Sequence, residues 1–148
     1  IMGLRSPVHT LARLINPFNA TATMQAIFHP AYRSSHQQTA LMLGYQNTAV
    51  IKGEGGEFER NPDARTLVCG IKNGNPYELE WPMLNPARSD PEESFDLNYF
   101  IDVWEGSTQH DYGSKAVIGT IALALFTLQK SDNMDDAMQT AKQMWTNR

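Results

Sequence analysis

Apolar residues recur at two different spacings along this chain, and each spacing predicts a different kind of secondary structure. Near the amino end, Ser6-Pro7 is typical of an N-cap followed by proline at the first helical position. Apolar side chains then follow at helical spacing from Val8 to Ile15, until Asn16-Pro17 interrupts the pattern. The spacing predicts a helix over this segment.

The next segment combines two strand patterns with one helix pattern. Residues 23–28 and 48–52 are short runs typical of strands, and between them Pro30 opens a helix that Gly44 closes. A strand, a helix and a strand within about 30 residues form a βαβ unit, which implies a parallel strand pair joined by a right-handed crossover.

The pattern changes to a β-hairpin after Gly53. Residues 66–72 and 76–81 flank Asn73-Gly74, and this dipeptide is the strongest short-range signal for a hairpin turn. Apolar residues alternate with others on both arms, which predicts that one face of the hairpin is packed. These residues are Leu67, Cys69, Ile71, Tyr77, Leu79 and Trp81.

Three helices are predicted for the remainder of the chain. Asp90-Pro91-Glu92-Glu93 is a capping-box start for the first, which places Leu97, Phe100, Ile101 and Trp104 on one face. The second, over about 112–130, is apolar nearly all round and should be buried. The third carries a methionine-rich stripe from Met134 to Trp145, typical of core packing. The prediction is a single α/β domain over residues 1–148.

Composition narrows the class of protein. Hydrophobic residues make up 41% of the 148 residues and charged residues 19%, as in ordinary globular domains, and a net charge of −4 gives no support to binding nucleic acid over the whole surface. The longest apolar run, 116–128, is too short for a bilayer span of roughly 20 residues. With Cys69 as the sole cysteine and no leader pattern in residues 1–5, we expect a cytoplasmic protein without a membrane partner.

The segment Gly53-Glu54-Gly55-Gly56-Glu57 is the first candidate site. It follows a predicted strand, as phosphate-binding loops do, but its carboxylates would repel a phosphate unless a divalent cation lay between them. Glu54 and Glu57 are therefore candidate Mg²⁺ ligands, since Mg²⁺ is often held by one or two carboxylates together with substrate phosphates. The alternative is a glycine-rich surface turn with solvated glutamates.

Other candidate residues are single side chains. Arg5 stands just before the first predicted helix, where it could bind a carboxylate or simply lie on the surface. None of the four histidines has zinc-site spacing; His29 comes at a strand end, where loop or capping histidines are also common. Arg60, Arg65 and Lys72 are the nearest approach to a basic cluster. We assign no catalytic residue from these patterns.

Residues 2–11 (Met-Gly-Leu-Arg-Ser-Pro-Val-His-Thr-Leu), continuing to Leu14-Ile15-Asn16-Pro17-Phe18, resemble a segment of the anthranilate phosphoribosyltransferase family. The order of the following elements is also similar to that family, with His29-Pro30 where the family often has Asp-Pro, then a Gly-acid-Gly loop and a hairpin. The resemblance covers the whole chain but only the C-terminal part of the family's length.

The resemblance implies the C-terminal part of the nucleoside phosphorylase and phosphoribosyltransferase α/β domain, without the N-terminal helical domain and the pyrophosphate-binding half. Family members are usually homodimers in tryptophan biosynthesis that transfer phosphoribose from phosphoribosyl pyrophosphate to an aromatic acceptor with Mg²⁺. The fragment alone is then expected to be inactive. Arg5 matches the arginine that contacts the acceptor's carboxylate. The family's Asp-Glu metal pair falls on Glu57 and Phe58, so the second carboxylate is lost unless Glu54 or Glu59 substitutes for it.

Two other functions remain open on the same fold. The string Gly-Glu-Gly-Gly-Glu-x-Glu-Arg-Asn-Pro, residues 53–62, resembles a divergent branch of the family proposed to bind nucleic acid and to lack anthranilate activity. A nucleoside phosphorylase-like activity, in which phosphate replaces pyrophosphate, is a weaker alternative.

Overall fold

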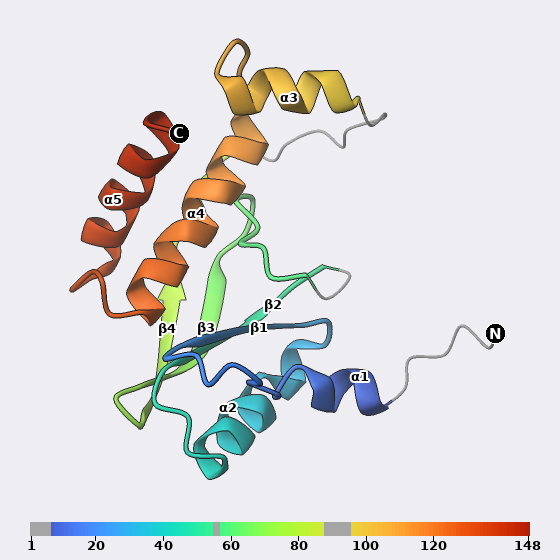
Figure 1. Ribbon diagram of the computed structural model, residues 1–148, viewed down its shortest axis with the longest axis vertical. Coiled ribbons are helices and arrows are strands. Elements are labelled where there is room, and N and C mark those ends of the chain that lie inside the picture. The colour runs from blue at the N-terminus through green and yellow to red at the C-terminus, as the bar shows by residue number, and fades with distance from the viewer. Residues whose placement is uncertain (1–6, 55–56, 88–95) are drawn as a thin grey trace, which may run out of the picture. The chain divides into compact units, whose positions relative to one another are not determined.

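The computed structural model describes residues 7–54, 57–87 and 96–148 and confirms the α/β class (Figure 1). In this part of the chain, five α-helices and a short 3₁₀ helix accompany a four-stranded sheet of order β1-β2-β3-β4. The elements are α1 (Pro7–Ala12), β1 (Thr23–Ile27), η1 (Pro30–Tyr32), α2 (Arg33–Met42), β2 (Thr48–Lys52), β3 (Thr66–Lys72), β4 (Asn75–Trp81), α3 (Leu97–Glu105), α4 (Asp111–Thr127) and α5 (Met134–Thr146).

The fold divides into two compact units. The first comprises Ile1–Phe58 and Leu67–Leu79, and the second comprises Glu59–Thr66 and Glu80–Arg148. The first unit contains the predicted βαβ arrangement, and the second contains the three C-terminal helices. The organisation of residues 1–148 as a single domain stays a prediction.

The βαβ prediction is confirmed in the first unit. β1 pairs in parallel with β2 from Thr23 opposite Thr48 to Ile27 opposite Lys52, and α2 forms the crossover between them (Figure 1). Ala40 of α2 is fully buried, as are the central residues of β2. β2 is apolar and buried because it has a strand on either side and packs against a helix.

The predicted hairpin is also confirmed, but the expectation of a single packed face is wrong for β3, where Val68 is buried as well as Cys69 and Ile71. Asn73 and Gly74 have φ angles of 51° and 74°, and a two-residue turn with both angles positive twists in the sense that the flanking strands require. Across the hairpin, the Tyr77 ring lies directly over Gly70, where a Cβ atom would come within 2.3 Å of the ring. Burial of this ring raises the pKa of the Tyr77 hydroxyl to about 12.

The first helix is shorter than predicted, and its apolar stripe does not reach the core. α1 ends at Ala12, and two turns follow in which Leu14 N donates to Leu11 O and Ile15 N donates to Ala12 O. Val8, Leu11 and Ile15 remain more than 60% exposed, whereas Leu14 is buried beside Ala40 and Ile71. The chain changes direction after Ala12, so that the helical spacing no longer places Ile15 on the face of Val8.

Helices α4 and α5 lie side by side in the second unit (Figure 1). Small buried residues, among them Ala122, Ala137 and Ala141, allow the helices to approach closely. The buried helix predicted near 112–130 is present, although it is buried on one face only, and Val117 is 38% exposed. Neither α4 nor any other helix in the described ranges is long and apolar enough to cross a membrane.

Helix α3 begins later than the predicted capping box. Asp90-Pro91-Glu92-Glu93 lies outside the described residues, and the described helix starts at Leu97 with Asp96 as its N-cap. The Asp96 side chain accepts hydrogen bonds from Asn98 N and Tyr99 N. The predicted apolar face does not face the core, because Leu97, Ile101 and Trp104 are exposed and Val103 is the buried residue of the helix.

Candidate functional site at the carboxyl edge of β1 and β2

The carboxyl ends of β1 and β2 meet at one edge of the sheet because the two strands are parallel. Gly53 extends the pairing by one step, since its N–H donates to Ile27 O at 2.9 Å. This contact places the start of the Gly53 loop beside the end of β1. In open α/β folds, ligands bind at this edge of the sheet.

A hollow of about 200 Å³ opens at the end of β1, within the first unit. It combines a cationic side chain with aromatic rings and histidines, contributed by α1, by the end of β1 and by the start of the crossover. The lining residues are His9, Thr10, Arg13, Ile27, Phe28, His29, Tyr32 and His36. Such a mixture suits a ligand with both a flat apolar part and a negative charge.

Arg13 is the cation of this hollow. It is half-buried and makes no hydrogen bond or ion pair with another residue in the described ranges. An arginine in this state presents its fork of N–H donors to whatever enters, and that fork matches a carboxylate or a phosphate in shape. Sequence reasoning missed Arg13 because only the fold brings the residue after α1 to the end of β1.

Three rings form the apolar side of the hollow. The His29 ring packs edge-on against Phe28 at 4.9 Å and against Tyr32 at 6.1 Å, measured between ring centroids. His29 occupies the N-cap position of η1, but its side chain makes no capping hydrogen bond. The residue therefore lies in the strand-end position expected of a ligand site and does not serve as a side-chain cap.

His36 closes the inner end of the hollow. Its side chain is buried, and Nδ1 lies 2.9 Å from Gln25 Oε1. Burial lowers the pKa of His36, and the nearby positive charge of Arg13 lowers it further, so that the ring is neutral at pH 7. Helical spacing in the sequence could have indicated that His36 is buried. It lies beside Gln37 and four residues before Ala40, and these three residues form the buried face of α2.

The Gly53 loop folds back on itself at the same edge. A Cβ atom on Gly53 would lie 2.2 Å from Glu57 O and 2.7 Å from Ala26 Cβ, so only glycine fits there. Glu57 N donates to Glu54 O at 3.4 Å, and both glutamate side chains are exposed. The intervening Gly55 and Gly56 lie outside the described residues.

The donors in this loop fit a cation only with help from a ligand. In the described part of the chain, no group of three or more His, Cys, Asp or Glu residues could hold a metal ion. Glu54 and Glu57 suit a Mg²⁺ ion that takes its remaining oxygens from phosphates and water. Phe58 is half-buried and offers no ligand, while Glu59 accepts a hydrogen bond from Tyr112 in the second unit. The metal site stays a prediction.

Arg5, predicted to bind a carboxylate, lies outside the described residues. It precedes α1, the helix whose His9 and Thr10 line the hollow. Its role stays a prediction.

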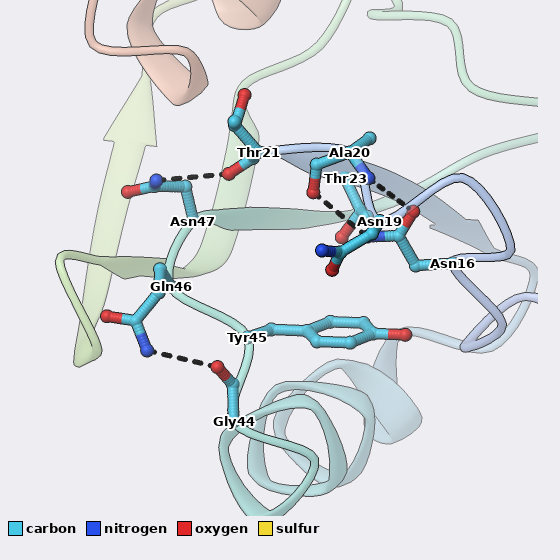
Figure 2. A pocket seen from close by; sticks show the side chains of 9 residues that line it. All are labelled: Asn16, Asn19, Ala20, Thr21, Thr23, Gly44, Tyr45, Gln46 and Asn47. Carbon is cyan, nitrogen blue, oxygen red and sulfur yellow. Dashed lines mark hydrogen bonds between the residues drawn. The ribbon is translucent and has the colours of Figure 1, made fainter.

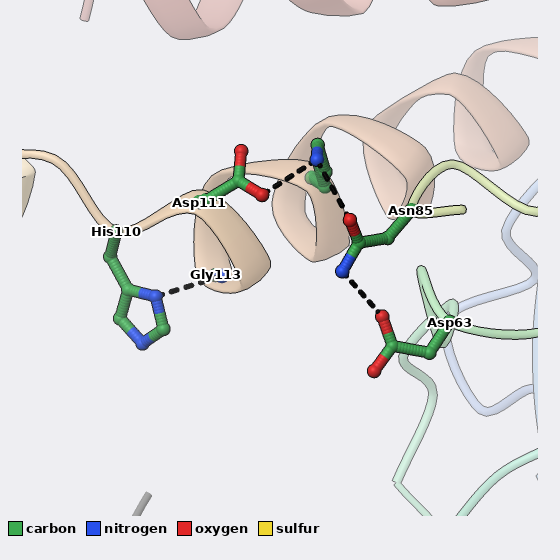
Figure 3. Close-up of polar contacts among 6 residues, drawn as sticks. Asp63, Asn85, His110, Asp111 and Gly113 are labelled. Atoms are coloured by element: carbon green, nitrogen blue, oxygen red, sulfur yellow. Dashed lines mark hydrogen bonds and ion pairs between the residues drawn. The ribbon is translucent and has the colours of Figure 1, made fainter. Parts of the chain in front are cut away.

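A second polar constellation surrounds the start of α4 in the second unit (Figure 3). Lys115 Nζ contacts Asp111 Oδ2 at 2.6 Å and Asn85 Oδ1 at 3.1 Å, and Asn85 Nδ2 donates to Asp63 Oδ1 at 2.7 Å. His110 Nδ1 accepts from Gly113 N at 3.3 Å and caps the helix. These bonds connect the turn at Asp63 and the segment at Asn85 to the first turn of α4, which is a structural role.

The basic residues Arg60 and Arg65 differ in the second unit: Arg60 lies inside it, and Arg65 is exposed beside a carboxylate that offsets its charge. Arg60 is fully buried, and Arg65 Nη1 pairs with Glu80 Oε1 at 3.0 Å. Arg60 therefore cannot contact a phosphate backbone without unfolding of its surroundings. The sequence suggested a basic cluster of Arg60, Arg65 and Lys72. Arg60 does not belong to an exposed cluster, because it is buried.

The sequence was compared with those of known proteins. No family model matches the chain. It is similar to anthranilate phosphoribosyltransferases of Bordetella avium (strain 197N), 26% identical over 99% of this chain, and of Yersinia pestis (strain Pestoides F), 29% identical over 95%. An uncharacterised protein of Aquifex aeolicus is 34% identical over 45% of the chain and 22% of its own length. The chain spans 44% of the length of each of the two transferases.

Proposed function

We propose that the chain is the C-terminal α/β domain of a phosphoribosyltransferase-like protein whose acceptor is an aromatic carboxylic acid. The observation that carries the proposal is Arg13, which has no hydrogen-bond or ion-pair partner among the described residues and lies in an aromatic-lined hollow at the carboxyl edge of the parallel strands. The similarity to anthranilate phosphoribosyltransferases over nearly the whole chain supports it.

In this proposal the hollow binds the acceptor through two kinds of contact. The Arg13 guanidinium pairs with the carboxylate of the acid, and the rings of Phe28 and Tyr32 pack against its aromatic part. Arg5 adds a second contact to the carboxylate, as the family resemblance implies. The half-buried position of Arg13 strengthens the ion pair because less water competes with the ligand.

His36 acts as a positioning residue. Because the ring is neutral, it adds no second positive charge beside Arg13 and leaves the acid's carboxylate to the arginine. Its hydrogen bond to Gln25 Oε1 holds the ring at the inner end of the hollow. It thereby limits how deeply the acceptor enters.

Mg²⁺ would be held by Glu54 and Glu57, where it would neutralise the charge of the pyrophosphate leaving group. The loop that carries the two glutamates starts at the edge of the sheet where the hollow lies, since Gly53 N donates to Ile27 O at the end of β1. We further propose that turnover needs additional polypeptide, because the chain matches less than half of the relatives' length. We also propose that the longer protein is a homodimer, as the family resemblance implies. The chain alone binds the acceptor without converting it.

The test is a fluorescence titration of the 148-residue chain with anthranilate. Arg13→Ala should weaken binding about tenfold or more, because a hydrogen-bonded charge pair is lost. Lys130→Ala, at an exposed position beyond the end of α4, is the matched control and should leave the affinity unchanged. Circular dichroism of both variants verifies that the fold is retained.

Two results would overturn the proposal. Equal affinity of wild type and Arg13→Ala would remove the hollow from acceptor binding. Absence of anthranilate binding, together with binding of single-stranded DNA that falls steeply with salt, would favour the nucleic-acid alternative. For the longer protein, loss of anthranilate fluorescence with phosphoribosyl pyrophosphate and Mg²⁺ measures the transfer itself.

A further inference from the structure

A second hollow, of about 210 Å³, lies at the opposite edge of the first unit, where β1 and β2 begin (Figure 2). Asparagine, glutamine and threonine side chains supply its polar lining, together with the Tyr45 ring and the turn at Gly44. None of its lining residues is charged. Because this edge is remote from the carboxyl ends of the strands, the hollow is separate from the proposed acceptor site and independent of it.

The walls of the hollow are held by hydrogen bonds from asparagine side chains to the main chain. Asn16 Nδ2 donates to Ala20 O at 2.9 Å, and Ala20 N donates back to Asn16 Oδ1 at 2.9 Å. On the other wall, Asn47 Nδ2 donates to Thr21 O at 3.2 Å (Figure 2). A site whose walls are fixed in this way loses little conformational entropy when a ligand binds.

Among the side chains that line the hollow, Thr23 and Asn19 retain unused hydrogen-bonding capacity. Thr23 Oγ1 is buried and has no hydrogen-bond partner in the described chain, which costs free energy unless a ligand supplies one. Asn19 has a φ angle of 49°, and its side-chain amide makes no hydrogen bond with another described residue. Asparagine adopts this left-handed backbone more readily than most residues other than glycine.

Tyr45 supplies a flat apolar surface. Its hydroxyl donates to Leu14 O, which fixes the ring, and the side chain remains half-buried. In Figure 2 the ring lies between the turn at Gly44 and the residues Asn16 and Asn19. A ring held in this position can stack against a planar ligand while the Asn19 amide reaches the ligand's edge.

We propose that this hollow binds a neutral nucleobase, stacked on Tyr45 and hydrogen-bonded by Asn19 and Thr23. A charged ligand is disfavoured because no lining residue could compensate its charge. A base carries its donors and acceptors along one edge, where an asparagine amide can pair with two of them.

The test is an amide NMR titration of the 148-residue chain with adenosine, uridine and ribose. Both nucleosides, or one of them, should shift the resonances of residues 16–23 and 44–47, and ribose should not. A short oligonucleotide is titrated in parallel. A higher affinity for the oligonucleotide than for the free nucleoside would show that the hollow binds a base within a strand.

Two variants separate binding from folding. Thr23→Val removes a buried hydroxyl without a protein partner, so it should leave the thermal midpoint unchanged or higher while weakening the nucleoside about tenfold. Asn19→Ala should weaken it similarly, and Asn98→Ala, on an exposed face of α3, is the matched control. No shifts with millimolar nucleoside, shifts of the same size with ribose, or unchanged affinity in both variants would overturn the proposal.

Discussion

The guanidinium carbon of Arg60 lies 4.9 Å from the centroid of the Trp81 ring, and both side chains are fully buried in the second unit. No carboxylate of the described residues pairs with Arg60; its Nη2 donates to Pro82 O and its Nη1 contacts Met138 Sδ at 3.5 Å. Burial lowers the pKa of Arg60 to about 10. The cation is thus stabilised by a ring face and by main-chain oxygen.

Two substitutions of Arg60 should show separately how the packing of its aliphatic stem and the burial of its charge affect the free energy of unfolding. Arg60→Ala leaves a cavity beside Trp81, and we expect it to lower the free energy of unfolding by about 2–4 kcal/mol. Arg60→Met keeps most of the stem without the charge, and should cost at least about 1 kcal/mol less. Urea unfolding monitored by Trp fluorescence measures both; equal losses would contradict this account.

Acid should destabilise the first unit through His36. Its pKa is lowered in the folded chain, so between the unfolded value of 6.5 and the lower folded value the unfolded chain binds more protons. The stability is therefore fully present above pH 6.5 and is lost as the pH falls through the folded pKa, by at most about 1.4 kcal/mol per pH unit.

The comparison of wild type with His36→Gln isolates this contribution, since the other histidines titrate in both proteins. Urea unfolding at pH 7.5, 6.5 and 5.5 should show a smaller acid loss in the variant. An identical pH dependence in both proteins would show that His36 is not the responsible group.

Two glycines should respond to alanine for different reasons. Gly53→Ala places Cβ within 2.2 Å of Glu57 O, so the loop or strand must move, and we expect a loss of more than about 2 kcal/mol. Gly44 has a φ of 80° but open space around it, so Gly44→Ala should cost only about 1 kcal/mol of conformational strain. Thermal unfolding measures both, and the reverse order would be inconsistent with the loop geometry at Gly53.

The start of α3 should depend on Asp96. Asp96→Ala removes the acceptor for Asn98 N and Tyr99 N, and we expect a loss of about 1 kcal/mol. Asp96→Asn, which keeps an acceptor oxygen, is the control and should retain most of the stability. Hydrogen exchange at these two amides reports the cap directly, and unchanged exchange in Asp96→Ala would place the start of the helix elsewhere.

Local pattern was sufficient for most of the elements. The βαβ unit was predictable because the strand runs and the Pro30 helix start are encoded within short windows, and the hairpin because Asn73-Gly74 favours two positive φ angles. The start of the Gly53 loop was also predictable, because the end of a strand run and the glycines that follow it lie within one short window. The identity of its metal ligands was not, because the positions of side chains on a surface loop are not encoded in periodicity.

Only the tertiary structure decided which apolar and charged residues are inside. Helical spacing grouped Val8 with Ile15, but the turns after Ala12 expose both and bury Leu14 instead. Arg60 reads as a surface cation, yet it is fully buried against Trp81, 21 positions later in the chain. Contacts between distant segments determine burial, and periodicity within one segment contains no information about them.

The candidate sites show the same division. The sequence by itself determined that a strand ends near His29, that the next strand enters a glycine-rich acidic loop, and that the two strands are parallel neighbours. The tertiary structure decided that Arg13 and His36 converge on that strand end, and that Asn16 and Asn47 face one hollow at the other end. Convergence depends on how α1 and α2 pack against the sheet, and that packing arises from the summed contacts of the whole unit.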